Sequence, residues 1–226
     1  MSKENATEKK EKSQRLTSLD ALRGFDMFWI VGAEEVVHAL GKSHDAGWTK
    51  LLADQLTHKS WEGFAFYDCI FPLFVFLAGV SMVFSLTRTI EERGKAYTLR
   101  KVFIRSLILY TIGIFYYGGF SDGVENIRLL GVLQRIALCY LFAAIIFCMT
   151  GLKGRVTALV VLLVGYWAMM TFIPVPGVGA GNFEEGKNLA NHVDEMYLPL
   201  FKWNGDHDPE GLLSTLPAIG SCLLGV

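Results

Sequence analysis

The fold is decided by the stretch His58-Lys59-Ser60-Trp61-Glu62-Gly63-Phe64-Ala65-Phe66-Tyr67-Asp68, which runs directly into the apolar segment Cys69 to Val83. With its flanks, this segment has the length of a membrane-crossing helix, which needs about 20 mainly apolar residues. A histidine and an acid at the start of such a segment cost free energy, because ionisable side chains are unfavourable near the membrane, and packing alone does not require them. The stretch therefore predicts a transmembrane helix with chemistry at a membrane surface.

The composition is that of a membrane protein with several spans. Of the 226 residues, 52% are hydrophobic, and the mean hydropathy is +0.35, whereas soluble domains contain roughly 45–50% apolar residues. The apolar residues form blocks separated by short charged connections, which predicts an all-α, polytopic transmembrane helix bundle. The net charge of −1 argues against a nucleic-acid partner bound through its phosphates. The lipid bilayer is the expected partner, and a homo-oligomer is compatible with this composition.

The apolar blocks predict five full membrane spans and a truncated sixth. The full spans are expected over residues 19–40, 66–86, 102–117, 129–149 and 156–173. The sixth begins at Leu212, and the chain stops at Val226, short of the ~20 residues that a crossing needs. Residues 16–226 are therefore expected to be the amino-terminal portion of a larger bundle, after a charged, disordered tail over residues 1–15.

Basic residues mark one side of the membrane. They occur in the tail, in the connection between the second and third spans, and at Lys153 and Arg155 between the fourth and fifth. Cytoplasmic connections carry such an excess of Lys and Arg, so the N-terminus is expected in the cytoplasm. The loops 41–65 and 174–210 then face the outside. The expected location is an integral membrane one, in the cytoplasmic (inner) membrane if the protein is bacterial.

Three motifs lie in or border the loop 174–210. Pro174-Val175-Pro176-Gly177 should end the fifth span, because Pro and Gly do not continue a helix cheaply. Asp208-Pro209-Glu210-Gly211 is typical of a helix start, with Asp as cap and Pro at the first helical position. Gly177-Val178-Gly179-Ala180-Gly181 lacks the strand-to-helix context of a phosphate-binding loop, so we interpret it as a flexible loop.

The first expected span carries charges that a lipid-facing helix would not. At about 100° per residue, Glu34 and His38 share a face, and Arg23 and Asp26 are neighbours three residues apart. A charge at the bilayer centre costs roughly 2.5–3.5 kcal/mol, so this face must look inward or lie near an interface. The charges are compatible with a proton relay and equally with structural ion pairs to the fourth span.

The four cysteines, Cys69, Cys139, Cys148 and Cys222, all fall inside apolar blocks. No close pair has metal-ligand spacing, so we expect neither a metal site nor a disulfide framework. We interpret these residues as small buried hydrophobic side chains.

His58 and Asp68 are the candidate catalytic residues. An unperturbed imidazole has a pKa of about 6.5, so it can accept or relay a proton near neutral pH. Asp68 can orient that imidazole or bind an amine or a sugar hydroxyl. The alternatives are a surface histidine in a loop and a solvated helix-cap acid at the membrane boundary.

Arg128 and Arg135 are a second candidate group. They are seven residues apart, which would place them on almost the same helix face at ~100° per residue. Such a pair could hold phosphates or a carboxylate. The alternatives are snorkelling to the interface for Arg128, and a buried ion pair with Asp26 or Glu34 for Arg135.

Four motifs stand in order along the chain. They are Arg15-Leu16-Thr17-Ser18-Leu19-Asp20-Ala21-Leu22-Arg23-Gly24; His58-Lys59-Ser60-Trp61-Glu62-Gly63 with Asp68 and Phe71-Pro72-Leu73-Phe74-Val75-Phe76; Gly131-Val132-Leu133-Gln134-Arg135-Ile136; and Asp208-Pro209-Glu210-Gly211-Leu212-Leu213. As an ordered set they resemble the heparan-alpha-glucosaminide N-acetyltransferase family of multi-pass membrane acetyltransferases.

The resemblance implies transfer of an acetyl group from acetyl-CoA to a sugar amine or hydroxyl on the far side of the membrane. The family's active-site histidine falls on His58 and its following acid on Asp68. His58 is then expected either to deprotonate the acceptor or to carry the acetyl group transiently. We expect the cofactor to be bound by Arg135, Gln134 and Arg128, and the acceptor by Trp61, Asp26 and Glu34.

Two further expectations concern the acceptor and a different function. The chain has no luminal-type extension before its first span, so the acceptor need not be heparan sulfate, and an envelope glycan or a free amino sugar is a plausible substitute by resemblance. A proton-coupled transporter or flippase that uses the charges of the first and fourth spans is the alternative function.

Overall fold

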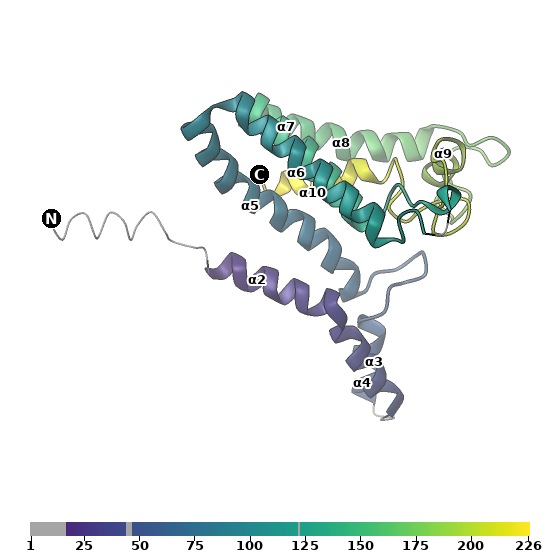
Figure 1. The fold of residues 1–226 in the computed structure, drawn as a ribbon. Coiled ribbons are helices and arrows are strands. Elements are labelled where there is room, and N and C mark those ends of the chain that lie inside the picture. The colour runs from purple at the N-terminus through teal and green to yellow at the C-terminus, as the bar shows by residue number, and fades with distance from the viewer. Residues whose placement is uncertain (1–16, 44–46, 122) are drawn as a thin grey trace. The chain divides into compact units, whose positions relative to one another are not determined.

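The computed structural model describes residues 17–43, 47–121 and 123–226, and the regular elements in this part of the chain are all helices (Figure 1). Its extended pairings are isolated backbone bridges, Arg128 with Phe201 and Val175 with Gly179. The all-α expectation is therefore confirmed. The expected tail, residues 1–15, lies outside the described residues.

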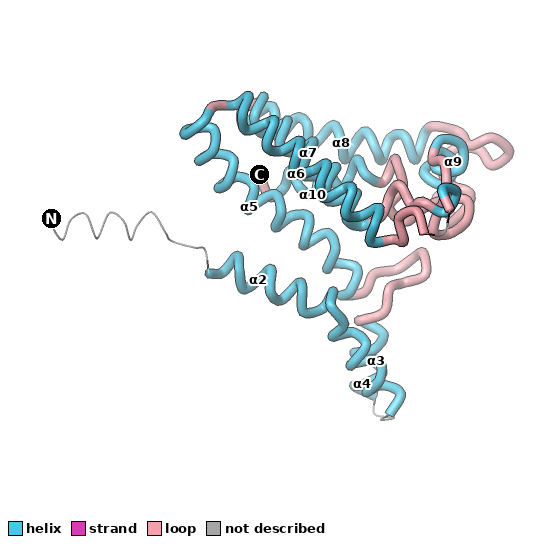
Figure 2. Tube along the Cα trace, in the orientation of Figure 1, coloured by secondary structure: helices cyan, strands magenta, loops and turns pink. Residues whose placement is uncertain are grey.

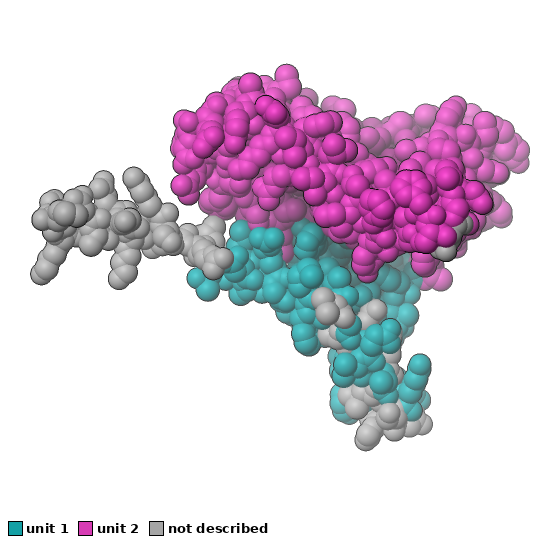
Figure 3. All heavy atoms as spheres, viewed as in Figure 1, with its two compact units in different colours: residues 1–59, 63–74 teal, residues 60–62, 75–226 magenta. Residues whose placement is uncertain are grey.

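The chain divides into two compact units (Figure 3). Unit 1 comprises residues 1–59 and 63–74, and unit 2 comprises residues 60–62 and 75–226. The helix α5 (Ile70–Arg93) begins in the first unit and continues into the second.

In unit 1, the continuous helix expected over residues 19–40 is broken. The chain forms α2 (Thr17–Phe28), a kinked segment η1 (Trp29–Ala33) and α3 (Glu34–Ser43). The break lies at Gly32, whose φ of 134° and ψ of 14° are not helical. Glycine reaches this region without a steric penalty because it has no Cβ. The single first span predicted from hydropathy is therefore wrong as one helix.

The expected outer loop 41–65 contains a helix that the sequence reasoning missed. α4 extends over Gly47–Gln55 and packs against α3. Its apolar residues Trp48, Leu51 and Leu52 recur at helical spacing and are exposed. This i, i+3, i+4 pattern was the available signal, but nine residues are too few to stand out by hydropathy.

Three described helices are long and apolar enough to cross a membrane. They comprise Phe66–Arg93, which is the short helix η2 (Phe66–Cys69) followed by α5, together with α7 (Val132–Met149) and α8 (Leu152–Phe172). α6 (Lys95–Tyr116) is equally long but carries four basic residues in its first half. It begins seven residues before the expected span because Lys and Arg are good helix formers and extend the helix past the apolar block.

α7 is the centre of unit 2, and it packs against α6 and against α10 (Thr215–Leu224). The stripe on α6 that is buried consists of Thr98, Val102, Ser106 and Gly113. Small residues at a helix interface let two backbones approach closely, which is the usual packing mode of membrane helices. Along α7 the buried residues are mostly small as well, including Ala137, Ala143, Ala144 and the two cysteines.

α8 exposes apolar side chains along most of its length. Met170 is its buried residue, while Val160, Val161, Val164 and Trp167 are exposed. Such a face suits lipid better than water. As expected, the helix ends before Pro174, and Val175 then closes a turn through a backbone bond from its amide to the carbonyl of Gly179 (2.8 Å).

The loop 174–210 is not devoid of structure, because it contains α9 (Leu189–Tyr197). α9 packs on the end of α8 through a small core of Met170, Val175 and Leu189. Figure 2 shows the long loops of unit 2 gathered at this end. The cysteines are free; Cys139, Cys148 and Cys222 are buried as expected, but Cys69 is exposed, so its interpretation as a buried residue is wrong.

Candidate active site

The structure brings His58 and Asp68 together in unit 1. The distance from His58 Nδ1 to Asp68 Oδ1 is 2.7 Å. A carboxylate only accepts hydrogen bonds, so Nδ1 carries the proton and donates it, which leaves Nε2 as the acceptor. The imidazole is 67% exposed, and Nε2 has no hydrogen-bond partner in the described part of the chain. His58 therefore presents a basic nitrogen to a ligand.

Asp68 is held in place by the backbone at the head of the α5 segment. Ala65 has an extended backbone before η2, and its N–H donates to Asp68 Oδ2 (2.8 Å). One carboxylate oxygen thus caps the helix start while the other faces His58, which is half of a capping box. The helix-cap interpretation of Asp68 is therefore confirmed, and the same carboxylate lies where it can orient the imidazole.

The turn that carries His58 is tied to α4 and η2 by side chains. Lys59 Nζ lies 2.7 Å from Asp54 Oδ1, and the Phe66 N–H donates to Gln55 Oε1 (3.2 Å). The ring of Tyr67 packs edge-on against the imidazole, with 4.7 Å between the ring centroids. These contacts restrict the directions in which the imidazole can point.

Trp61 belongs to unit 2, where its indole is anchored to the loop 174–210. Nε1 donates to the carbonyl of Phe183 (2.7 Å), and the ring meets that of His207 at 6.1 Å. Trp61 remains 41% exposed. An anchored indole with an exposed face can receive an acceptor, which is the role expected for it.

Arg128 does not lie on the same helix face as Arg135, because α7 begins only at Val132. Arg128 is only 5% exposed and forms a bidentate ion pair with Asp208. Nε donates to Oδ2 (2.8 Å) and Nη2 donates to Oδ1 (2.6 Å). Nη2 also donates to Glu210 Oε2 (2.6 Å). The expected shared helix face is therefore wrong, and the carboxylates that Arg128 holds are those of Asp208 and Glu210.

The guanidinium of Arg128 is also enclosed by aromatic rings. Its central carbon lies 4.6 Å from the ring centroid of Tyr117 and 5.1 Å from that of Trp203. Arginine suits such stacking because its planar cation is weakly hydrated. The interpretation of Arg128 as a snorkelling residue is excluded by this burial.

Arg135 and Gln134 are buried beside the same cluster. Arg135 Nη2 donates to the carbonyl of Pro209 (3.2 Å) and to Ser214 Oγ. Gln134 Nε2 donates to the carbonyl of Arg128 (3.1 Å), while its Oε1 has no partner among the described residues. The arginine therefore secures the segment before α10 from within unit 2.

The motif Asp208-Pro209-Glu210-Gly211 does not begin a helix. α10 starts at Thr215, and Asp208 instead accepts hydrogen bonds from Arg128 and from the N–H of Glu210 (3.0 Å). The physical reason is charge compensation, because a buried arginine needs a carboxylate more than the helix needs a cap. A search for partners of the buried cations would have found this role.

Asp194 is a residue of this cluster that the sequence analysis missed. It lies buried on α9 and accepts hydrogen bonds from the N–H groups of Leu212 (2.8 Å) and Asp208 (3.3 Å). Burial raises the pKa of its carboxyl group despite these bonds. Its sequence context, one acid among several in a polar helix, offered no separate signal.

The two acids beside Arg128 have pKa values shifted in opposite directions. Burial disfavours the Asp208 carboxylate, but the hydrogen bonds and charge of Arg128, together with the N–H groups of Glu210 and Trp203, hold its pKa below the ordinary value. For Glu210 burial is the stronger effect, and its pKa is raised even though Arg135 and Arg128 oppose this. Asp208 therefore stays ionised to a lower pH than an ordinary aspartate, whereas Glu210 binds a proton more readily than an ordinary glutamate.

The remaining predicted residues lie on the first helices. Asp26 is fully buried, and neither of its carboxylate oxygens has a hydrogen-bond partner among the described residues. The Glu34 side chain lies outside the described residues, so its expected role has no geometry. Within the described chain, no group of three or more His, Cys, Asp or Glu side chains is arranged to hold a metal ion.

The fold and the His58–Asp68 pair define an integral membrane protein of helices with a candidate histidine base at the head of a span. A model of the family described as heparan-alpha-glucosaminide N-acetyltransferase, catalytic, matches residues 15–206. The chain belongs to this family, whose members are membrane acyltransferases.

Two relatives carry the name heparan-alpha-glucosaminide N-acetyltransferase. The human protein is 29% identical over an alignment that covers 94% of this chain and 38% of its own length. The mouse protein is 27% identical, with 75% of this chain and 33% of its own length covered. The chain thus spans 33–38% of the length of these relatives.

Proposed function

We propose that the protein transfers an acetyl group from cytosolic acetyl-CoA to an amino sugar or glycan on the non-cytoplasmic side of the membrane. The observation that carries this proposal is the pair of His58 and Asp68, with Nδ1 occupied by a carboxylate and Nε2 open. The family match and the name of the relatives support the reaction class.

In the proposed reaction, His58 Nε2 accepts a proton from the acceptor amine while the amine nitrogen attacks the thioester carbonyl. The new C–N bond replaces the C–S bond, and His58 returns the proton to the leaving thiolate. Asp68 keeps the proton on Nδ1 and stabilises the imidazolium that forms, as an orienting acid does in a triad. If His58 instead carries the acetyl group, Nε2 attacks the thioester first, the C–S bond breaks and the thiolate leaves. The acceptor amine then attacks the acetyl carbon, the bond to Nε2 breaks, and the proton lost by the amine ends on the thiolate.

The other predicted residues take different parts in this proposal. Trp61 offers its exposed face to the acceptor, together with Asp26 and Glu34. The part of the site that binds the acetyl donor is formed by Arg128, Gln134 and Arg135. The charge of Arg128 is already paired, and the guanidinium of Arg135 bonds Pro209 and Ser214, so these residues hold the backbone around the donor in place. We also propose that the chain crosses the membrane five times from a cytoplasmic N-terminus, because the basic connections alternate with ones that are Gly-rich or acidic.

The first prediction tests the histidine and its acid. His58→Ala and Asp68→Asn should each lower acetyl transfer from labelled acetyl-CoA to glucosamine by about 10²-fold or more, because general-base catalysis and the correct tautomer are lost. His192→Ala on α9 is the matched control and should keep the wild-type rate. Folded His58→Ala protein that transfers acetyl groups at the wild-type rate would refute the assignment.

A second candidate function is a proton-coupled transporter or flippase. The observation in its favour is Asp26, a buried acid without a hydrogen-bond partner among the described residues. An acetyltransferase must bind CoA, whereas such a transporter has no reason to do so. Thermal stabilisation of the detergent-solubilised protein by acetyl-CoA therefore separates the two functions.

A further inference from the structure

The first half of α6 carries a basic hollow that contains none of the residues assigned to the proposed acetyl transfer. A cavity of about 390 Å³ is lined by Tyr97, Arg100, Lys101, Ile104 and Arg105. At ~100° per residue these five positions fall within one arc of about 140° on the helix. The sequence therefore places three cations and a tyrosine on one face.

Aromatic rings hold cations at both ends of this face. The central guanidinium carbon of Arg105 lies 5.9 Å from the ring centroid of Tyr140 on α7, and that of Arg93 lies 5.1 Å from the ring centroid of Tyr97. Cation–π contacts restrict a long side chain without neutralising its charge. The hollow is thus partly organised before any ligand arrives.

The three cations of the hollow have no ion-pair partner in the described part of the chain. The acid Glu92 already pairs with Arg88 (2.7 Å). The contrast with Arg128 is direct, because that arginine has two carboxylates. Three like charges within two helical turns repel one another, and an anion relieves this repulsion.

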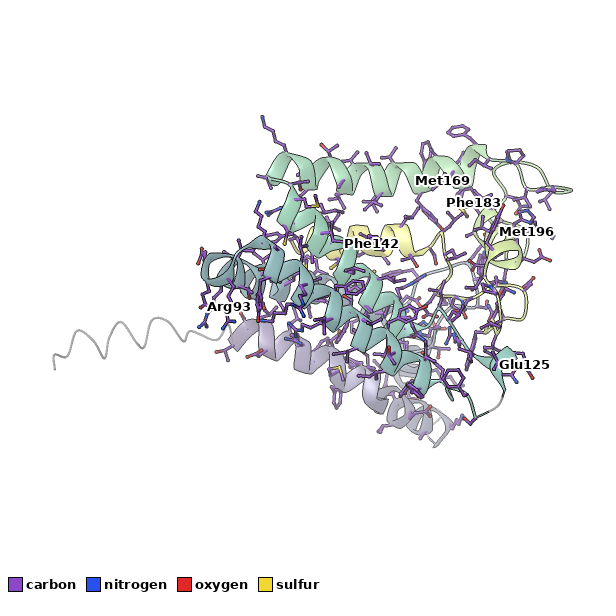
Figure 4. All side chains as sticks on the ribbon, turned by 45° about the horizontal axis from the view of Figure 1, so that its top comes forward. Arg93, Glu125, Phe142, Met169, Phe183 and Met196 are labelled. Carbon is purple, nitrogen blue, oxygen red and sulfur yellow. The ribbon has the colours of Figure 1, made fainter. Side chains whose placement is uncertain are left out.

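The hollow lies at the end of unit 2 away from α9. Arg93, next to it in the chain, is at one end in Figure 4, whereas Phe183 and Met196 are at the other, and Figure 1 shows the α5–α6 and α7–α8 connections at the same end as Arg93. Basic residues flank both connections, Arg93 and Lys95 at the first and Lys153 and Arg155 at the second. In the proposed topology this end is cytoplasmic, where phosphate esters and anionic headgroups are found.

We propose that Arg100, Lys101 and Arg105 form a binding site for phosphate esters. Two arginine forks and one ammonium group match several phosphate oxygens, and charge-assisted bonds of this kind are strong. The chemistry fits the phosphates of CoA and the headgroup of an anionic lipid. The site would bind phosphate groups whether or not the protein transfers acetyl groups, because the cations recognise the phosphate charge and not the acetyl group.

The experiment uses the full chain in nanodiscs. Binding of CoA and of pantetheine, which lacks the phosphates, is measured by calorimetry in phosphatidylcholine discs, and retention of phosphatidylglycerol is measured by native mass spectrometry. Arg100→Gln and Lys101→Gln should each lower the affinity for one of these two phosphate ligands by about tenfold. Lys153→Gln removes one exposed charge near the same end and is the matched control.

Each outcome decides the proposal. Loss of CoA affinity without loss of pantetheine affinity identifies the nucleotide as the ligand, and loss of retained phosphatidylglycerol identifies the lipid. The site is refuted if the two variants bind both phosphate ligands as the wild type does, or if Lys153→Gln weakens them equally. His58→Ala should leave this binding intact. If the wild-type protein binds CoA normally but transfers no acetyl group, the proposed reaction is contradicted and the site is not.

Discussion

Arg128 is the residue on which the polar core of unit 2 depends. It bonds two carboxylates and contacts two aromatic rings while it is almost fully buried. Removing one partner of a buried ion pair costs about 3–5 kcal/mol, because the other charge stays buried without compensation. Arg128→Met should therefore lower the stability of the protein by about this amount, measured as unfolding in detergent.

The exposed pair of Lys187 and Glu184 provides the comparison. Its atoms are as close, at 2.7 Å, but both side chains are in solvent. Lys187→Met should leave the unfolding midpoint nearly unchanged. The double variant Arg128→Met with Asp208→Leu should recover part of the loss, since it leaves no isolated charge on Asp208. Equal midpoints for the wild type and Arg128→Met would show that the cluster contributes little.

Glu210 and Asp208 should give opposite pH dependences of stability. The raised pKa of Glu210 means that its contribution is complete below the unfolded value of about 4.3 and is lost as the pH rises through the folded value. The lowered pKa of Asp208 means that its contribution is complete above about 3.9 and is lost as the pH falls.

These signs define a measurement with paired variants. Relative to the wild type, Glu210→Gln should become more stable as the pH rises above about 4.3. Asp208→Asn should be destabilised at neutral pH, and its difference from the wild type should shrink as the pH falls. Unfolding in denaturant, followed from pH 3 to pH 8, tests both. Parallel curves for all three proteins would contradict the assigned directions.

At the scale of elements, the segment before α10 packs tightly against α9 at Gly211 and Leu212. A Cβ on Gly211 would collide with the carboxylate of Asp194, which holds the amides of Leu212 and Asp208. Gly211→Ala should therefore destabilise the protein by about 1–3 kcal/mol through overpacking.

Gly165 on α8 is the matched control for this substitution. A Cβ there meets nothing within 4 Å, and the backbone is helical. Gly165→Ala should be neutral or raise stability by about 0.5–1 kcal/mol, because alanine is the better helix former. A greater loss of thermal stability for Gly165→Ala than for Gly211→Ala would contradict the packing described for α9.

The elements also show how far sequence reasoning reaches. Apolar blocks located α5, α7 and α8 because hydropathy is a property of the local chain. Gly32 broke the first expected span, and buried Arg128 drew Asp208 away from a helix cap. The His58–Asp68 contact followed from motifs, whereas Asp194 could not be predicted because its partners are backbone amides far along the chain.

At the scale of the whole molecule, the proposed topology makes the two ends of unit 2 chemically different. The loop 174–210 has seven Asp and Glu residues and two Lys, while the connections at the opposite end are basic. Such a distribution follows the bias of Lys and Arg toward the cytoplasm. The two ends should therefore be reached by reagents from opposite sides of the membrane.

Labelling of single cysteines tests this arrangement. In a Cys69→Ser background, which removes the exposed native thiol, Glu184→Cys lies in the outer loop and Lys153→Cys in the basic turn, both exposed. A membrane-impermeant maleimide should label Glu184→Cys in intact cells and Lys153→Cys only after permeabilisation. Labelling of both in intact cells, or the reverse pattern, would overturn the cytoplasmic N-terminus. The reverse pattern would also place the basic hollow of α6 on the side where cytosolic CoA cannot reach it.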